Sequence, residues 1–135
     1  MADDEPLSPG GYLLRPTVAL LGVAACVTLY FVVKLQPISV GAFAFAAVWL
    51  TIPHAAMAAL LLALHRRGKP LLPWCIAAVL VAALGLYVLI DAIYLHPDAQ
   101  SAIAVVIAPV LQGIVPLLVA PLAWWAGRRR SHRND

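Results

Sequence analysis

The chain has 135 residues, of which 64% are hydrophobic and 11% charged, and its mean hydropathy is +0.94. Soluble domains carry about 25% charged and about 45–50% apolar residues. This composition therefore excludes an ordinary water-soluble domain and predicts a chain whose solvent is the lipid bilayer. The net charge of +3 comes from basic residues gathered in two short segments, which is typical of membrane topology and argues against a nucleic-acid partner.

The first apolar run follows an acidic tail over residues 1–11. This tail lacks the basic start and the cleavage site of a signal peptide, so we expect it to be retained. The first span is predicted over residues 16–34, with Pro16 at the first helical position, where its missing N–H would be unpaired in any case. An 18-residue run free of charge, about 27 Å as a helix, is just long enough to cross a bilayer.

The second span is predicted over residues 38–64. Pro53 is expected to kink this helix, because it leaves the Trp49 carbonyl without its helical donor. Small side chains recur every four residues along one face, where a neighbouring helix can approach closely. We interpret this ridge as a helix-packing face; its members are Ala47, Thr51, Ala55, Ala59 and Ala63.

The third and fourth spans are predicted over residues 71–94 and 101–126, and a basic tail follows over residues 127–135. The fourth run contains three prolines and is expected to be the least regular helix. The carbonyls that these prolines leave free must be satisfied by neighbouring helices or by water. The length of the chain suits one transmembrane domain with short connections.

The orientation follows from the basic residues. Most of them lie in the loop between the second and third spans and in the C-terminal tail: Arg66, Arg67, Lys69, Arg128, Arg129 and Arg130. The positive-inside rule places that loop and both termini in the cytoplasm, where these side chains face anionic headgroups or a partner. The predicted fold is an all-α, integral membrane, antiparallel four-helix bundle in a bacterial inner membrane, with both termini inside.

Few polar side chains lie within the predicted spans. His54 and Gln112 are the deepest, and one interpretation is that they line a polar pocket or a proton path. The alternative is that they hydrogen-bond to each other as a purely structural contact. Towards the outer face, Lys34 and Asp91 are placed so that they can form an ion pair if their helices touch.

The outer rim carries Tyr94, His96 and Asp98, which we interpret as a solvated rim because two ligands are too few for a metal site. No cofactor is expected, since His54 has no second histidine at its depth for haem ligation. Cys26 and Cys75 lie in apolar runs and are interpreted as small buried side chains.

The sequence contains no phosphate loop, nucleophile elbow, zinc spacing or carboxylate pair, so no enzyme signature is met. The four-span outline is similar to that of the small multidrug transporters, but the first span has no counterpart of the glutamate that this family carries there, so no residue role is transferred. We predict a non-enzymatic protein that binds helix to helix, as an accessory, assembly or protective subunit, its partner being another membrane protein or a second copy.

Two alternatives remain open. The first is a small oligomeric channel or transporter with a polar path through His54, Gln112 and Asp91. The second, more distant alternative is an enzyme that acts on a lipid at the outer rim and uses His96 and Asp98.

Overall fold

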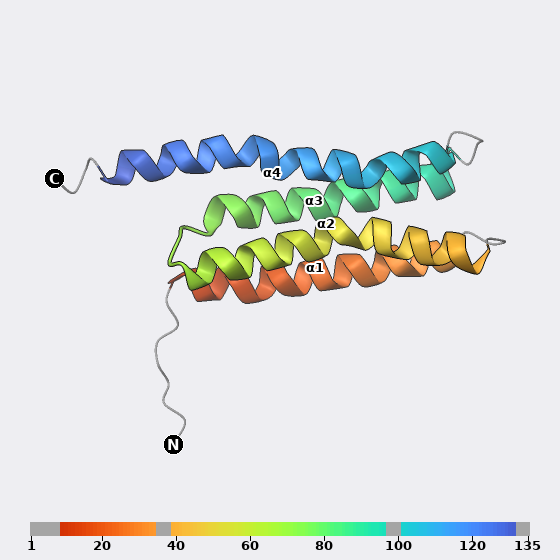
Figure 1. The fold of residues 1–135 in the computed structure, drawn as a ribbon, viewed down its shortest axis with the longest axis horizontal. Coiled ribbons are helices and arrows are strands. Elements are labelled where there is room, and N and C mark those ends of the chain that lie inside the picture. Colours follow the sequence, from red (N-terminus) through yellow and green to blue (C-terminus); the bar gives the residue numbers. More distant parts are fainter. Residues whose placement is uncertain (1–8, 35–38, 97–100, 132–135) are drawn as a thin grey trace, which may run out of the picture.

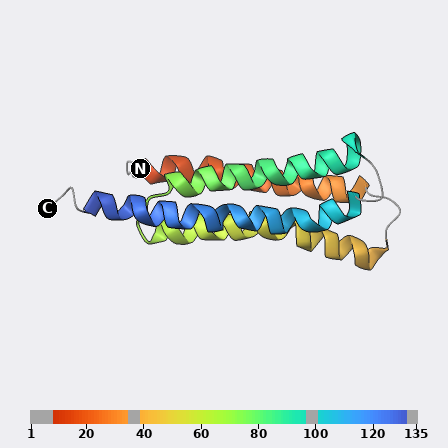
Figure 2. The same ribbon diagram turned by 90° about the horizontal axis from the view of Figure 1, so that it is seen from above.

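The structure is a computed structural model that describes residues 9–34, 39–96 and 101–131. The described chain consists of α1 (Pro9–Lys34), α2 (Val40–Arg66), α3 (Leu72–Ile90), the π-helical turn η1 (Asp91–Leu95) and α4 (Ser101–Ser131). The four long helices lie side by side, and we call this packed set the bundle (Figures 1 and 2). The beginning of α1, the connection between α2 and α3, and the end of α4 lie at one end of the bundle (Figure 1).

Each long helix is long and apolar enough to cross a membrane. The candidate spans are Gly11–Lys34, Val40–Arg66, Leu72–Leu95 and Val105–Trp125. A helix needs about 20 apolar residues to cross the hydrocarbon core, because it rises about 1.5 Å per residue. The four spans indicate an integral membrane protein, and they coincide with the four apolar runs recognised in the sequence.

The first helix begins earlier than the sequence predicted. α1 starts at Pro9, so Pro16 lies inside the helix and residues 9–11 belong to it, not to a separate tail. The preference of proline for the first helical position therefore applies to Pro9. The helix continues through Pro16, and Thr17 Oγ1 donates a hydrogen bond to the Leu13 carbonyl at 2.7 Å.

The second helix is closed at both ends by local hydrogen bonds. At its start, the Ala42 amide donates to Ser39 Oγ at 3.2 Å. At its end, the Gly68 amide donates to the His65 carbonyl and the Lys69 amide to the Leu64 carbonyl, both at 3.0 Å. This pair of bonds is a Schellman motif, and it requires the left-handed conformation that Gly68 adopts with φ of 64°.

Prolines shape α2 and α4 without interrupting them. The N-terminal part of α2, gold in Figure 2, is angled relative to the rest of that helix, and Pro53 is the proline inside α2. α4 continues as one helix through Pro109, Pro116 and Pro121. Between these two helices, Trp49 Nε1 donates to the Val106 carbonyl at 2.9 Å.

The helices pack around two buried apolar clusters. α1 packs against α2 and α3, and α4 packs against α3 and α2. The first cluster lies in the half of the bundle next to the α2–α3 connection and consists of Leu14, Leu21, Ala24, Met57, Leu61, Leu71, Cys75, Ala77, Ala78, Val81 and Ala82. The second cluster lies in the other half and consists of Val32, Leu50, Leu89 and Ala108.

The two cysteines differ in their surroundings. Cys75 belongs to the first cluster, as expected of a small apolar side chain. Cys26 is exposed on the outer surface of the bundle, so the expectation that it is buried was wrong. Hydropathy alone does not distinguish the two cases, because the lipid-facing side of a membrane helix is as apolar as its packed side.

Candidate functional site

Four residues lie between the two apolar clusters, one on each helix: Thr28 on α1, His54 on α2, Gly85 on α3 and Gln112 on α4. Along its own helix, each of these residues is three or four positions from a residue that belongs to the first cluster or packs against it. Each is also four positions from a member of the second cluster, so it lies about one helical turn from either cluster. All four are buried, and the side chains of Thr28, His54 and Gln112 are only 1–2% exposed. We call these four residues the polar layer.

Gln112 links α4 to α3 within this layer. Its Nε2 donates a hydrogen bond to the Val81 carbonyl at 2.8 Å. The same amide lies directly against Gly85, where a Cβ atom would overlap Gln112 Nε2. Gly85 therefore creates the space in which the Gln112 amide reaches the backbone of α3.

His54 is buried on α2, directly after Pro53. Within the described chain, neither Nδ1 nor Nε2 of this ring has a hydrogen-bond partner. The alternative of a structural His54–Gln112 hydrogen bond is therefore wrong, since Gln112 bonds to α3 instead. The physical reason is the space beside Gly85, which lets the Gln112 amide reach the Val81 carbonyl.

Thr28 is a member of the layer that the sequence analysis missed. Thr17 and Thr51 donate their hydroxyls to the carbonyls four residues earlier on their own helices, both at 2.7 Å. Thr28 makes no such bond, and its buried Oγ1 has no partner among the described residues. The available sequence signal was its depth, because Thr28 is the hydroxyl residue nearest the middle of the first span.

The prolines add backbone acceptors next to the layer. Pro53 has no N–H and cannot donate to the Trp49 carbonyl, and Pro116 likewise cannot donate to the carbonyl of Gln112. Such freed carbonyls in membrane helices are satisfied by neighbouring helices, hydroxyl side chains or ordered water. The layer therefore combines a hydroxyl, an imidazole and an amide with nearby backbone oxygens, and none of its four residues is a carboxylate, lysine or arginine.

The outer rim forms contacts other than the expected ion pair. Asp91 Oδ1 lies 3.0 Å from His96 Nδ1, and Lys34 Nζ lies 5.5 Å from the centre of the Tyr30 ring. The predicted Lys34–Asp91 pair is thus not formed. The π-helical turn explains this, because its wider spacing joins the His96 amide to the Asp91 carbonyl at 2.8 Å and places the two side chains together.

The remaining rim residues define no metal site in the described part of the chain. The Tyr94 ring packs edge-on against Phe31, with centroids 5.9 Å apart. Asp98, which was considered together with His96, lies outside the described residues. Within the described ranges, no group of three or more His, Cys, Asp or Glu side chains is placed to hold a metal ion.

The two parts of the small-residue ridge on α2 differ in their exposure. Ala47 and Thr51 are half-buried, whereas Ala55, Ala59 and Ala63 are exposed. The second part of the ridge is thus not covered by any other described helix of this chain.

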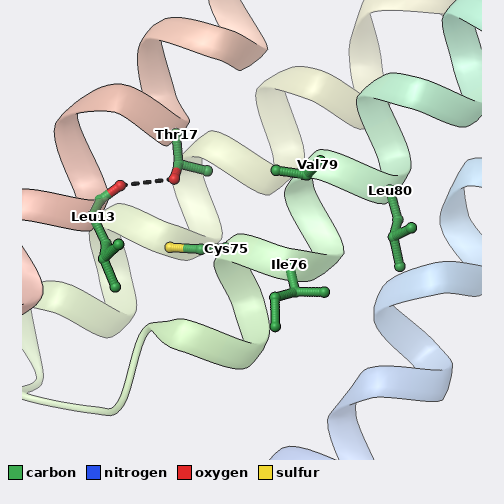
Figure 3. A pocket seen from close by; sticks show the side chains of 6 residues that line it. All are labelled: Leu13, Thr17, Cys75, Ile76, Val79 and Leu80. Carbon is green, nitrogen blue, oxygen red and sulfur yellow. Dashed lines mark hydrogen bonds between the residues drawn. The ribbon is translucent and has the colours of Figure 1, made fainter.

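An apolar groove lies on the surface of the bundle, near the end where α3 begins. It has a volume of about 310 Å³ and lies between α1 and α3, lined by Leu13, Thr17, Cys75, Ile76, Val79 and Leu80 (Figure 3). Figure 3 shows the Thr17 hydroxyl turned towards the Leu13 carbonyl, to which it donates. The groove is therefore lined by apolar side chains, the Cys75 thiol and a Thr17 hydroxyl that is already hydrogen-bonded.

Basic side chains are exposed at the same end of the bundle. Arg66, Arg67 and Lys69 are exposed at the α2–α3 connection. The side chains of Arg128, Arg129 and Arg130 lie outside the described part of the structure, although the backbone of α4 extends to Ser131.

Comparison with known proteins does not assign a family. A scan against protein-family models gives no match, and searches of curated proteins and of solved structures give no significant match either. The functional argument therefore depends on the surfaces and buried groups of this chain.

Proposed function

We propose that this protein is a non-enzymatic bacterial inner-membrane protein that acts by helix–helix binding, as an accessory, assembly or protective subunit of a membrane system. In this proposal the chain is an antiparallel four-helix bundle with both termini in the cytoplasm. The observation that carries the proposal is the exposed part of the α2 ridge, formed by Ala55, Ala59 and Ala63. The partner is another membrane protein or a second copy of this chain.

The physics of helix association in lipid explains why this ridge matters. An apolar side chain gains little by leaving lipid for another apolar surface, so association depends on close packing of backbones and side chains. Residues four apart share a face of a helix, and three alanines at that spacing form a shallow strip along which a second helix can approach. Larger exposed side chains on the other helices, such as Leu20 on α1 and Val79 on α3, keep a neighbouring backbone further away.

The distribution of charge supports the orientation. The exposed basic residues of the α2–α3 connection lie at the end of the bundle where α4 also ends. The arginines at the end of α4 follow the last apolar turn. The positive-inside rule assigns this end to the cytoplasm.

The arrangement of the interior favours binding over conduction. Apolar clusters lie on both sides of the polar layer, and Asp91 lies at the rim in contact with His96. A path through His54, Gln112 and Asp91 within one copy would have to pass through one of these clusters. The proposal therefore assigns the activity to the outer surface of α2.

The test is purification of the tagged protein from its native host in a mild detergent, followed by mass identification of whatever accompanies it. The double variant Ala55→Leu/Ala59→Leu should lose its partner, because the added side chains separate the two backbones. The control is Ala19→Leu/Ala83→Leu, which makes the same change at two exposed alanines on α1 and α3 and should keep the partner. Unchanged recovery of the partner with the ridge variant would disprove binding through α2.

A further inference from the structure

We infer that the polar layer is a binding site for buried water, held between Thr28 and His54 in the middle of the bundle. Both side chains are almost completely buried, with exposures of 1% and 2%. Oγ1 of the threonine and both ring nitrogens of the histidine have no hydrogen bond of standard geometry within the described residues, although the Leu50 carbonyl lies near the His54 ring. This site is independent of the binding surface proposed for α2.

Such unpaired groups are costly in a membrane interior. A buried polar group without a partner strongly destabilises the folded state in hydrocarbon, because nothing there replaces the hydrogen bonds that it makes to water. Native structures avoid this cost by pairing nearly all buried polar atoms with protein groups or with ordered water. Two unpaired side chains in one layer therefore point to a shared bound molecule.

The chemistry of the two side chains selects the ligand. A neutral imidazole carries one donor and one acceptor, and a threonine hydroxyl can both donate and accept. Water offers two donors and two acceptors, and a buried water typically makes about three hydrogen bonds. The layer contains no carboxylate, lysine or arginine, so its composition suits a neutral molecule.

The neighbouring backbone supplies a third contact for the water. Pro53 precedes His54 and leaves the Trp49 carbonyl without its helical donor. Ordered water is one of the known means by which such freed carbonyls are satisfied in membrane helices. A water between Thr28, His54 and this carbonyl would complete the hydrogen bonding of α1 and α2 at this level.

The contrast with the other threonines supports this assignment. Thr17 and Thr51 satisfy their hydroxyls on their own helices, which is the ordinary solution for a threonine in an apolar helix. Thr28 does not use this solution, although α1 continues through it as a regular helix. Apolar clusters on both sides of the layer then separate the site from both ends of the bundle.

The direct test is solid-state NMR of the full-length protein in lipid vesicles, with isotope-labelled histidine and magnetisation transferred from water protons. The His54 ring should receive this transfer, whereas a labelled Met57 methyl group in the adjacent apolar cluster should not. Thr28→Val should abolish or strongly reduce the transfer to His54, because the water loses one of its partners. If His54 receives no more transfer than Met57, the water site does not exist.

A matched control separates loss of the water from a general effect of removing a hydroxyl. Thr17→Val makes the same chemical change at a threonine that is bonded to its own helix, so the transfer to His54 should be unchanged. Equal transfer in Thr28→Val and in the unmodified protein would show that Thr28 does not hold the water, and would overturn the shared site. Thr28→Ala provides the same test if the valine variant fails to insert.

A double-mutant cycle distinguishes shared water from a direct contact. Thr28→Val and His54→Phe, singly and together, should be coupled by at least about twofold in the unfolding equilibrium constant, the lower limit expected for groups in one network. Additive effects would contradict a shared ligand. Coupling without any transfer from water would also overturn the inference, because it would indicate a direct Thr28–His54 hydrogen bond.

Discussion

The side-chain amide of Gln112 occupies the space that Gly85 leaves by having no side chain. The Nε2 atom of this amide donates to the Val81 carbonyl at 2.8 Å, and a Cβ atom at position 85 would overlap it. The contact joins α3 and α4 in the middle of the bundle.

Gly85→Ala should destabilise the protein by roughly 1–3 kcal/mol, the usual cost of forcing extra volume into a packed interior. The cost should fall in the double variant Gly85→Ala/Gln112→Ala, which removes the overlapping amide. Gly113→Ala is the control, because a Cβ there meets nothing within 4 Å, and it should be neutral or stabilise by up to about 1 kcal/mol. Unfolding in mixed micelles measures all three. Equal effects at positions 85 and 113 would contradict the close fit.

Gln112→Met should destabilise the protein by about 0.6 kcal/mol, and by no more than about 1.7 kcal/mol, the range for hydrogen bonds between membrane helices. The methionine keeps the length of the side chain but cannot donate to the Val81 carbonyl. Hydrogen exchange should then increase in α3 around Val81. A stability equal to that of the unmodified protein, with exchange also unchanged, would show that the bond contributes nothing.

Trp49→Phe should loosen the contact between α2 and α4, because it removes the indole N–H that donates to the Val106 carbonyl at 2.9 Å. The expected loss of stability is about 0.6 kcal/mol, and no more than about 1.7 kcal/mol, as for other hydrogen bonds between membrane helices. Hydrogen exchange should increase in α4 around Val106. Trp74→Phe is the control, since Trp74 packs against the first apolar cluster, and it should leave exchange in that part of α4 unchanged.

Lys34 and Asp91 should behave independently. Lys34→Met and Asp91→Asn are each expected to change stability by less than about 1 kcal/mol, as is usual for exposed charges. Their double variant should show no coupling, because Lys34 lies over the Tyr30 ring and Asp91 contacts His96. Coupling between positions 34 and 91 would restore the ion pair that the sequence suggested. The same double-mutant cycle applied to Asp91 and His96 is the positive control and should show coupling.

The orientation proposed for the membrane predicts a labelling pattern. With Cys26 and Cys75 replaced by alanine, a cysteine at Ser39 should react in intact cells with a reagent that does not cross membranes. A cysteine at Lys69 should react only after the cells are opened, because the basic loop is assigned to the cytoplasm. Both positions are exposed at helix ends, so access to the side chain does not limit the reaction. The reverse pattern would invert the proposed topology.

Much of the fold could be predicted because helix formation in lipid depends on the hydrophobicity and the backbone hydrogen bonds of each segment by itself. In lipid every backbone amide and carbonyl must be paired within the segment, so a long apolar run has little choice but to be a helix. The four helical spans followed from this rule. The start of α1 did not, because Pro9 and Pro16 are both compatible with a first helical position.

The partners of the polar side chains were decided only by the tertiary structure. Lipid-facing and packed positions are equally apolar, so the sequence did not show that Cys26 and Ala59 face outwards while Thr28 faces the interior. Nor did it show that Gln112 would bond to α3 and not to His54, since that choice depends on which helices adjoin and on the space beside Gly85. Composition and hydropathy determined that the chain is helical and belongs in a membrane. The packing of the four helices determined which polar groups are paired and which have no partner among the described residues, because hydrogen bonds depend on distances that only the folded chain defines.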